Sequence, residues 1–141
     1  MPNTTQRIVA GGTINPFRFV MPDSSAEHQG LQATANAEIL GVAGEETKYA
    51  PLSDLVSTNP HAAAGDPVNL RGDGEEAMVE AGGSFSAGVL LKSDANGKAV
   101  AAATTGTTLQ QFGGRSQQAA AAEGDIIRMT VQPGSIRPAI A

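Results

Sequence analysis

The sequence has no cysteine, no tryptophan and a single tyrosine among its 141 residues. The lack of cysteine excludes a disulfide framework and thiol catalysis. No stretch approaches the ~20 consecutive apolar residues that a membrane-spanning helix needs, so no membrane partner is predicted. The N-terminal segment MPNTTQRIVAGG has neither the basic flank nor the apolar core of an export signal, and we expect the chain to be made in the cytoplasm.

Basic residues are also scarce, and they are scattered along the chain. Nine Lys and Arg stand against 14 Asp and Glu, which gives a net charge of −5 and a pI near 4.9. A nucleic-acid-binding surface needs clustered basic residues, so this composition excludes DNA or RNA as an expected partner. Large apolar residues are few beside the 17 glycines and the many alanines, which bury little area each. So few large apolar residues indicate either long unpacked arms around a small core or a subunit whose core is completed by neighbouring subunits, and both are typical of a component of an assembly.

The apolar residues that are present lie in short stretches separated by glycine and proline. Three segments, AAAGDPVNL, SFSAGVLL and AAAEGDIIRM, place small residues and a glycine directly before an apolar strand; the glycines are Gly65, Gly88 and Gly124. A glycine at such a point permits the turn or bulge that leads into a strand. No segment keeps helical periodicity beyond about two turns. We therefore predict an all-β fold, a small barrel- or sandwich-like module of short strands with long loops.

The stretch LLKSDANGKAV, residues 90–100, predicts a hairpin whose polar turn contains Asp94, Asn96 and Gly97. Asn-Gly favours a tight turn because both residues tolerate positive φ. A calcium loop would need a carboxylate where Lys92 stands, and a phosphate-binding loop would need a glycine there. We therefore interpret the segment as a hairpin turn that holds no metal and no cofactor.

No group of residues has the spacing of a catalytic site. His28 and His61 stand singly in polar loops, without the paired spacing of a zinc site. Asp73, Glu75 and Glu76 lie in a glycine-rich turn, where solvent rather than an apolar pocket is expected around the carboxylates. The sequence therefore predicts no enzymatic activity, no catalytic residues and no bound metal.

Several apolar residues near the two ends fall outside the recurring strands. They lie next to prolines, and they are Phe17, Phe19, Val20, Ile136 and Ile140. Because flanking prolines disfavour a central strand, and exposed apolar side chains promote aggregation, we expect them to be ordered only against a partner or a neighbouring subunit. The expected organisation is an extended N-terminal arm over residues 1–29, a β-rich module over 30–132 and a C-terminal tail over 133–141. Deleting residues 1–22 is then expected to leave a folded module that binds its partner poorly.

The combination of these segments resembles a known family. GLQATANAEILGVAGE, AAGDPVNL, VEAGGSFSAGVLLKSDANGKAVAA and FGGRSQQAAAAEGDIIRMTV, which together span most of residues 30–132, are similar to segments of the small capsid decoration (cement) proteins of tailed bacteriophages. The resemblance implies a β-rich module on the exterior of the virion head. It also implies a homotrimer that binds the major capsid protein and holds neighbouring capsid subunits together.

Two other classes of virion protein are compatible with the same composition. A minor tail or fibre component would share the short strands and the lack of catalytic groups. A receptor- or carbohydrate-binding module would need exposed aromatic rings for stacking, and only Tyr49 and the phenylalanines are available for that purpose. Head decoration is the function that the sequence favours.

Overall fold

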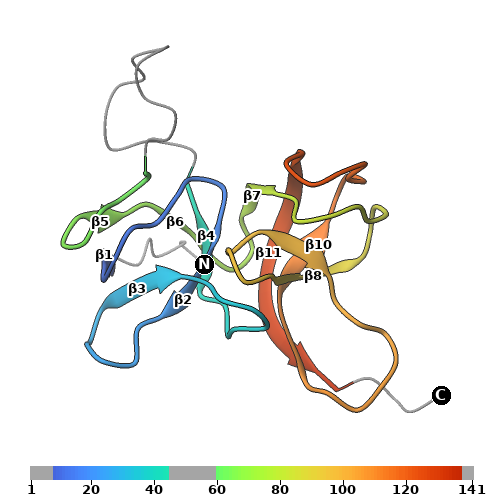
Figure 1. Cartoon of the computed structure of the whole chain (residues 1–141), viewed down its shortest axis with the longest axis horizontal. Coiled ribbons are helices and arrows are strands. Elements are labelled where there is room, and N and C mark those ends of the chain that lie inside the picture. The colour runs from blue at the N-terminus through green and yellow to red at the C-terminus, as the bar shows by residue number, and fades with distance from the viewer. Residues whose placement is uncertain (1–7, 45–59, 138–141) are drawn as a thin grey trace.

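The computed structural model describes residues 8–44 and 60–137, which form two β-sheets lying side by side (Figure 1). Every helix or strand in these ranges is a strand, which confirms the predicted all-β fold. Within the same ranges, no helix is long and apolar enough to cross a membrane. We call residues 8–44 and 60–71 the first lobe, and residues 72–137 the second lobe.

The first lobe contains a six-stranded sheet. Its neighbouring strands are antiparallel except for β1 and β3, which are parallel. The strand order is β5-β1-β3-β2-β4-β6. The strands are β1 (Ile8–Ala10), β2 (Phe19–Pro22), β3 (Gln29–Gln32), β4 (Gly41–Ala43), β5 (Pro67–Val68) and β6 (Leu70–Arg71).

The second lobe contains an antiparallel five-stranded sheet in the order β7-β11-β10-β8-β9. Its strands are β7 (Glu76–Glu80), β8 (Leu90–Ser93), β9 (Ala99–Ala101), β10 (Gln110–Ser116) and β11 (Ile126–Ile136). Ala81, which follows β7, forms a parallel bridge with Ala99 of β9. The two ends of the sheet therefore meet, and the second lobe is barrel-like, as the sequence predicts.

The N-terminal segment belongs to the fold, so the prediction that it lies outside the core is wrong for its described residues. β1 and β2 are inner strands of the six-stranded sheet. Phe19 and Val20 are both fully buried, at 0% exposure. The two prolines do not prevent this arrangement, because Pro22 is the last residue of β2 and Pro16 precedes the strand. Because deleting residues 1–22 would remove core side chains, we no longer expect a folded module to remain.

Two apolar clusters form the core, and the first lobe contributes to both. One lies within that lobe and contains Val20 together with Ile8, Ala10, Ile14, Ala43, Ala62, Val68 and Leu70. The other fills the second lobe and also contains Phe19, Ala33, Ile39 and Val42 of the first. Successive residues of a strand point to opposite faces, so neighbours on β2 are buried in different clusters. The middle of the six-stranded sheet is therefore a wall with a core on each side.

The three glycines expected to precede strands have the backbone conformation that the prediction requires. Gly65, Gly88 and Gly124 have φ angles of 89°, 82° and 96°. Strands β5, β8 and β11 each begin two residues after one of them. A Cβ at these positions would meet nothing within 4 Å, so the left-handed backbone, rather than lack of space, selects glycine.

The expected C-terminal tail begins inside a strand. β11 continues from Ile126 to Ile136 and pairs with β10 beyond residue 132. Phe112 lies over Gly134, since a Cβ on that glycine would be 2.8 Å from the ring. Residues 133–136 are thus part of the second sheet, whereas Ile140 lies outside the described residues.

Candidate functional site

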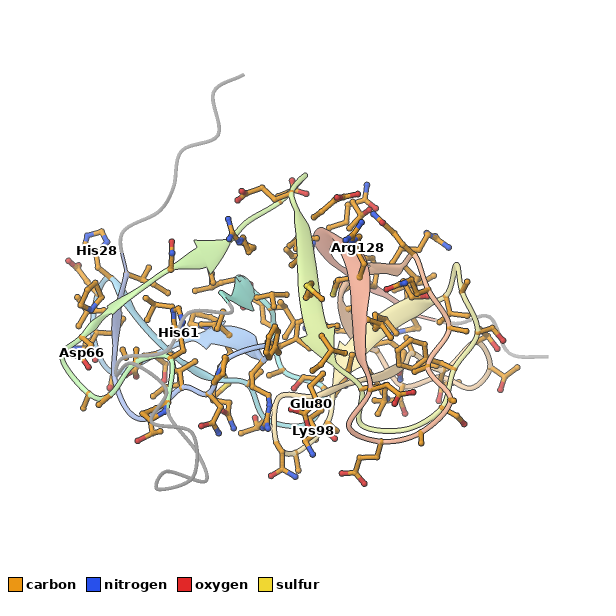
Figure 2. All side chains as sticks on the ribbon, turned by 90° about the horizontal axis from the view of Figure 1, so that it is seen from above. His28, His61, Asp66, Glu80, Lys98 and Arg128 are labelled. Carbon is orange, nitrogen blue, oxygen red and sulfur yellow. The ribbon has the colours of Figure 1, made fainter. Side chains whose placement is uncertain are left out.

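The His, Asp and Glu residues considered as catalytic candidates do not form a common site. Among residues 8–44 and 60–137, no three His, Asp or Glu side chains lie close enough to hold a metal ion. His28 is exposed, whereas His61 is buried and its Nε2 accepts the Asn69 N–H at 3.0 Å. Figure 2 shows the two histidines apart in the first lobe. Glu75 accepts the Gly72 N–H at 2.8 Å, so this carboxylate serves the turn before β7.

The hairpin turn joins β8 and β9, but its backbone differs from the predicted Asn-Gly turn. Gly97 has a φ of 78°, while Asn96 is not among the residues with positive φ. The Gly97 N–H donates to the Asp94 carbonyl at 3.2 Å, as in a type I turn with Asp first and Gly fourth. Asp94 Oδ1 accepts the N–H groups of Asn96 and Lys98 at 2.8 and 2.9 Å. The aspartate, rather than the asparagine, therefore sets this turn.

The tip of this turn also binds the first lobe, which the sequence does not predict. The Asn96 carbonyl accepts hydrogen bonds from Arg18 Nη1 at 2.9 Å and from Gln32 Nε2 at 3.0 Å. The Gly97 carbonyl accepts the Phe19 N–H at 2.8 Å. The hairpin thus connects the two lobes through backbone groups of its own turn.

Charged side chains reinforce this connection. Glu80 on β7 binds Arg18 at 3.3 Å and Lys98 at 3.1 Å, and Lys98 also binds Glu123 at 3.1 Å. Figure 2 shows Glu80 and Lys98 together near the junction of the lobes. The hydrogen bonds to Glu80 and then to Glu123 raise the pKa of Lys98 above its usual value of 10.5, against an opposing effect of burial. Because Arg18, Glu80 and Lys98 are each mostly buried, these ion pairs are screened less than pairs on an open surface.

The residues expected to contact a partner are not gathered in one place. Phe19 and Val20 lie in the two cores and present no surface. Phe17 is half-buried, and its carbonyl accepts the Glu80 N–H at 2.9 Å. Ile136, at the end of β11, is 43% exposed and is the one of these described side chains that is open to solvent.

Comparison with known proteins connects this fold with a phage head component. No protein-family model matches the sequence, and no curated protein matches it. The structure is similar to the crystal structure of the head fiber gp8.5 N base in bacteriophage phi29, with a TM-score of 0.57 and 18% sequence identity. The likeness covers 89% of this chain and 91% of that chain. The chain therefore shares its fold with the base of a phage head fiber.

Proposed function

We propose that the chain is a structural protein of a phage head, which binds the outer surface of the capsid and clamps neighbouring major capsid protein subunits. The observation that carries this proposal is the fold likeness to a head fiber base over 89% of the chain. The independent resemblance of residues 30–132 to decoration proteins supports the same location on the virion. A homotrimer, as in that family, is part of the proposal.

A second candidate function is the attachment of a fiber to the head. It is favoured because the likeness covers 91% of the chain of a fiber base. A clamp and a fiber base both bind the capsid, but they differ in copy number and in their effect on the capsid. A clamp occupies many equivalent positions and stabilises the shell, whereas a fiber base serves to display another segment.

Carbohydrate binding has less support from the surface of the protein. The large apolar side chains that are clearly exposed among the described residues are Val9, Met78, Leu109, Ile126 and Ile136. All of them are aliphatic or thioether side chains, and stacking on a sugar ring requires an aromatic face. Tyr49 lies outside the described residues, and Phe112 is the phenylalanine that lines an open hollow.

The proposal is tested with heads of the virus that encodes the chain, prepared without it. Purified chain is added at increasing concentration, the heads are separated by sedimentation, and bound copies per head are counted. A clamp saturates at a number close to the number of three-fold and local three-fold positions, or three times that number for a trimer, and raises the temperature at which heads disrupt. A fiber base saturates at the number of fiber attachment sites on the head and does not raise the temperature at which heads disrupt.

The mass of the free chain, measured by sedimentation velocity before mixing, tests the trimer separately. Heads that bind no chain at micromolar concentration would contradict both candidate functions. The control is a sample of the same chain that has been unfolded by heat and cleared of aggregates.

A further inference from the structure

The outer surface of the second lobe carries two adjoining hollows. Their volumes are about 600 and 540 Å³, and both are lined by Leu90, Arg115 and Ile136. The larger hollow continues over Val89 and the alanines of 101–103, and the smaller one over Phe112 and Pro133. We call the two hollows together the β8–β11 groove. Its floor is mostly apolar, although it is open to solvent.

The register of the sheet explains why these side chains share one face. Leu90 of β8 is paired with Arg115 of β10, so both point away from the core on the outside of the sheet. A register shift between Phe112 and Gly114 changes the path of β10 there, and the Phe112 ring lies over Gly134 of β11. The end of β11 then places Ile136 at the rim with 43% of its surface exposed. The fold itself therefore leaves an apolar groove uncovered.

The larger hollow of the groove has a cationic rim in an acidic protein, whereas the smaller hollow is lined by both Arg115 and Asp73. Arg115 and Arg137 line the larger hollow, and none of the residues that line it is a carboxylate. Arg115 is held in place because its Nη1 donates to the Gly88 carbonyl at 2.7 Å. Neither arginine is in an ion pair with a carboxylate of the described residues. With a net charge of −5 over the chain, two such arginines beside an apolar floor form a local site for an anionic partner.

We propose that the β8–β11 groove binds an extended segment of the capsid protein in which acidic side chains stand next to aliphatic ones. This inference rests on the proposed function, because it names the surface through which the chain would bind the head. Aliphatic side chains would cover Leu90 and Ile136, and carboxylates would pair with Arg115 and Arg137. A two-fold contact between copies of the chain fits less well, because it sets the same patch against itself and brings like charges together. Contact of the groove with a different surface of a neighbouring copy, as in a trimer, is the alternative that the particle mass tests.

The test compares groove variants with matched variants elsewhere on the same strands and surface. Ile136→Glu and Arg115→Glu alter the groove. Ile126→Glu and Arg128→Glu are the controls, since Ile126 is also on β11 and 38% exposed, Arg128 is also an exposed arginine, and neither lines the groove. Affinity for heads is measured by cosedimentation, and urea unfolding checks that all four variants are folded.

The groove variants are expected to bind heads at least about tenfold more weakly than the unaltered chain, while the controls bind within about threefold of it. Raising the salt concentration should weaken binding of the unaltered chain more than that of Arg115→Glu. Unchanged affinity of both groove variants would overturn the groove proposal and leave head binding intact. Failure of the unaltered chain to bind heads would instead overturn the proposed function and, with it, this inference. A smaller particle mass of the groove variants in sedimentation velocity would show that the groove joins copies of the chain, which also overturns the capsid partner.

Discussion

Replacing Phe19 with alanine tests the finding that the N-terminal segment is part of the core. The side chain is 0% exposed and belongs to the cluster that fills the second lobe, although its strand lies in the first. It approaches Gly113 of β10 so closely that a Cβ on that glycine would clash with the ring. The substitution therefore removes packing between the lobes and leaves a cavity between them.

The expected loss follows from the buried area. A phenylalanine buries about 150–250 Å², which at ~25 cal/mol per Å² corresponds to about 4–6 kcal/mol. Alanine keeps part of that area, and measured Phe→Ala substitutions in cores cost about 3–5 kcal/mol. Since whole domains are stable by about 5–15 kcal/mol, we expect this variant to lose a large fraction of its stability.

Urea unfolding at constant temperature measures this loss. With a dependence of about 2 kcal/mol per M, the midpoint should fall by about 2 M. Val9→Ala is the control, because Val9 lies in the same segment but is 37% exposed, and it should change the unfolding free energy by less than about 1 kcal/mol. If Phe19→Ala lowers stability no more than Val9→Ala, then residues 8–22 are an arm after all and the shared core is refuted.

Two further predictions concern the hairpin that joins the lobes. Gly97→Val should lower the free energy of unfolding by about 1–3 kcal/mol, because a φ of 78° strains a β-branched residue. Gly83→Val is the control, since Gly83 is at an open position without positive φ. Equal urea midpoints for the two variants would contradict the reasoning. Lys98→Met should be less stable than the unaltered chain near neutral pH. Because Glu80 and Glu123 raise the pKa of Lys98 above 10.5, its contribution is complete below pH 10.5 and is lost as the pH rises through the folded-state pKa. The difference in unfolding free energy between the two proteins should therefore shrink above pH 10.5, and a constant difference up to about pH 12 would show that charge is not its source.

The sequence predicts local features of this protein well because their causes are local. A glycine with small residues before an apolar stretch predicts a turn or bulge that leads into a strand, and Gly65, Gly88 and Gly124 each have a positive φ two residues before a strand. A polar stretch between two apolar runs at residues 90–100 predicts a hairpin, and β8 and β9 pair as its two strands. Each of these predictions depends on a few neighbouring residues.

The burial of the N-terminal segment in the core does not follow from a few neighbouring residues. A strand with one exposed face alternates apolar and polar residues, whereas a strand with a core on each side is apolar at consecutive positions. Phe19, Val20 and Met21 form such a run, but Ala77, Met78 and Val79 form one too and Met78 is exposed, so the run alone does not identify an internal strand. One neighbour of the Phe19 ring is Gly113 on β10, and no local pattern connects residues so far apart.

The turn at Asp94 illustrates a second limit. The pattern Asp-Ala-Asn-Gly satisfies both an Asn-Gly turn and a type I turn with Asp first and Gly fourth, and the sequence alone does not choose between them. The contacts of the Asn96 carbonyl with Arg18 and Gln32 help to fix its direction, and they come from the other lobe. Local turn chemistry therefore predicts the hairpin but not what its tip binds.

The wall shared by the two cores has a consequence for the order in which the chain folds. β1 pairs with β5 through Ile8 and Val68, so the six-stranded sheet is incomplete until both β5 and β6 have been synthesised. Its far side stays uncovered until Gly113 and β11 are available to pack against Phe19. Contacts between such distant segments slow folding and prolong the exposure of apolar strands. We therefore expect the nascent chain to remain unfolded, and open to association with other chains, until β11 has left the ribosome.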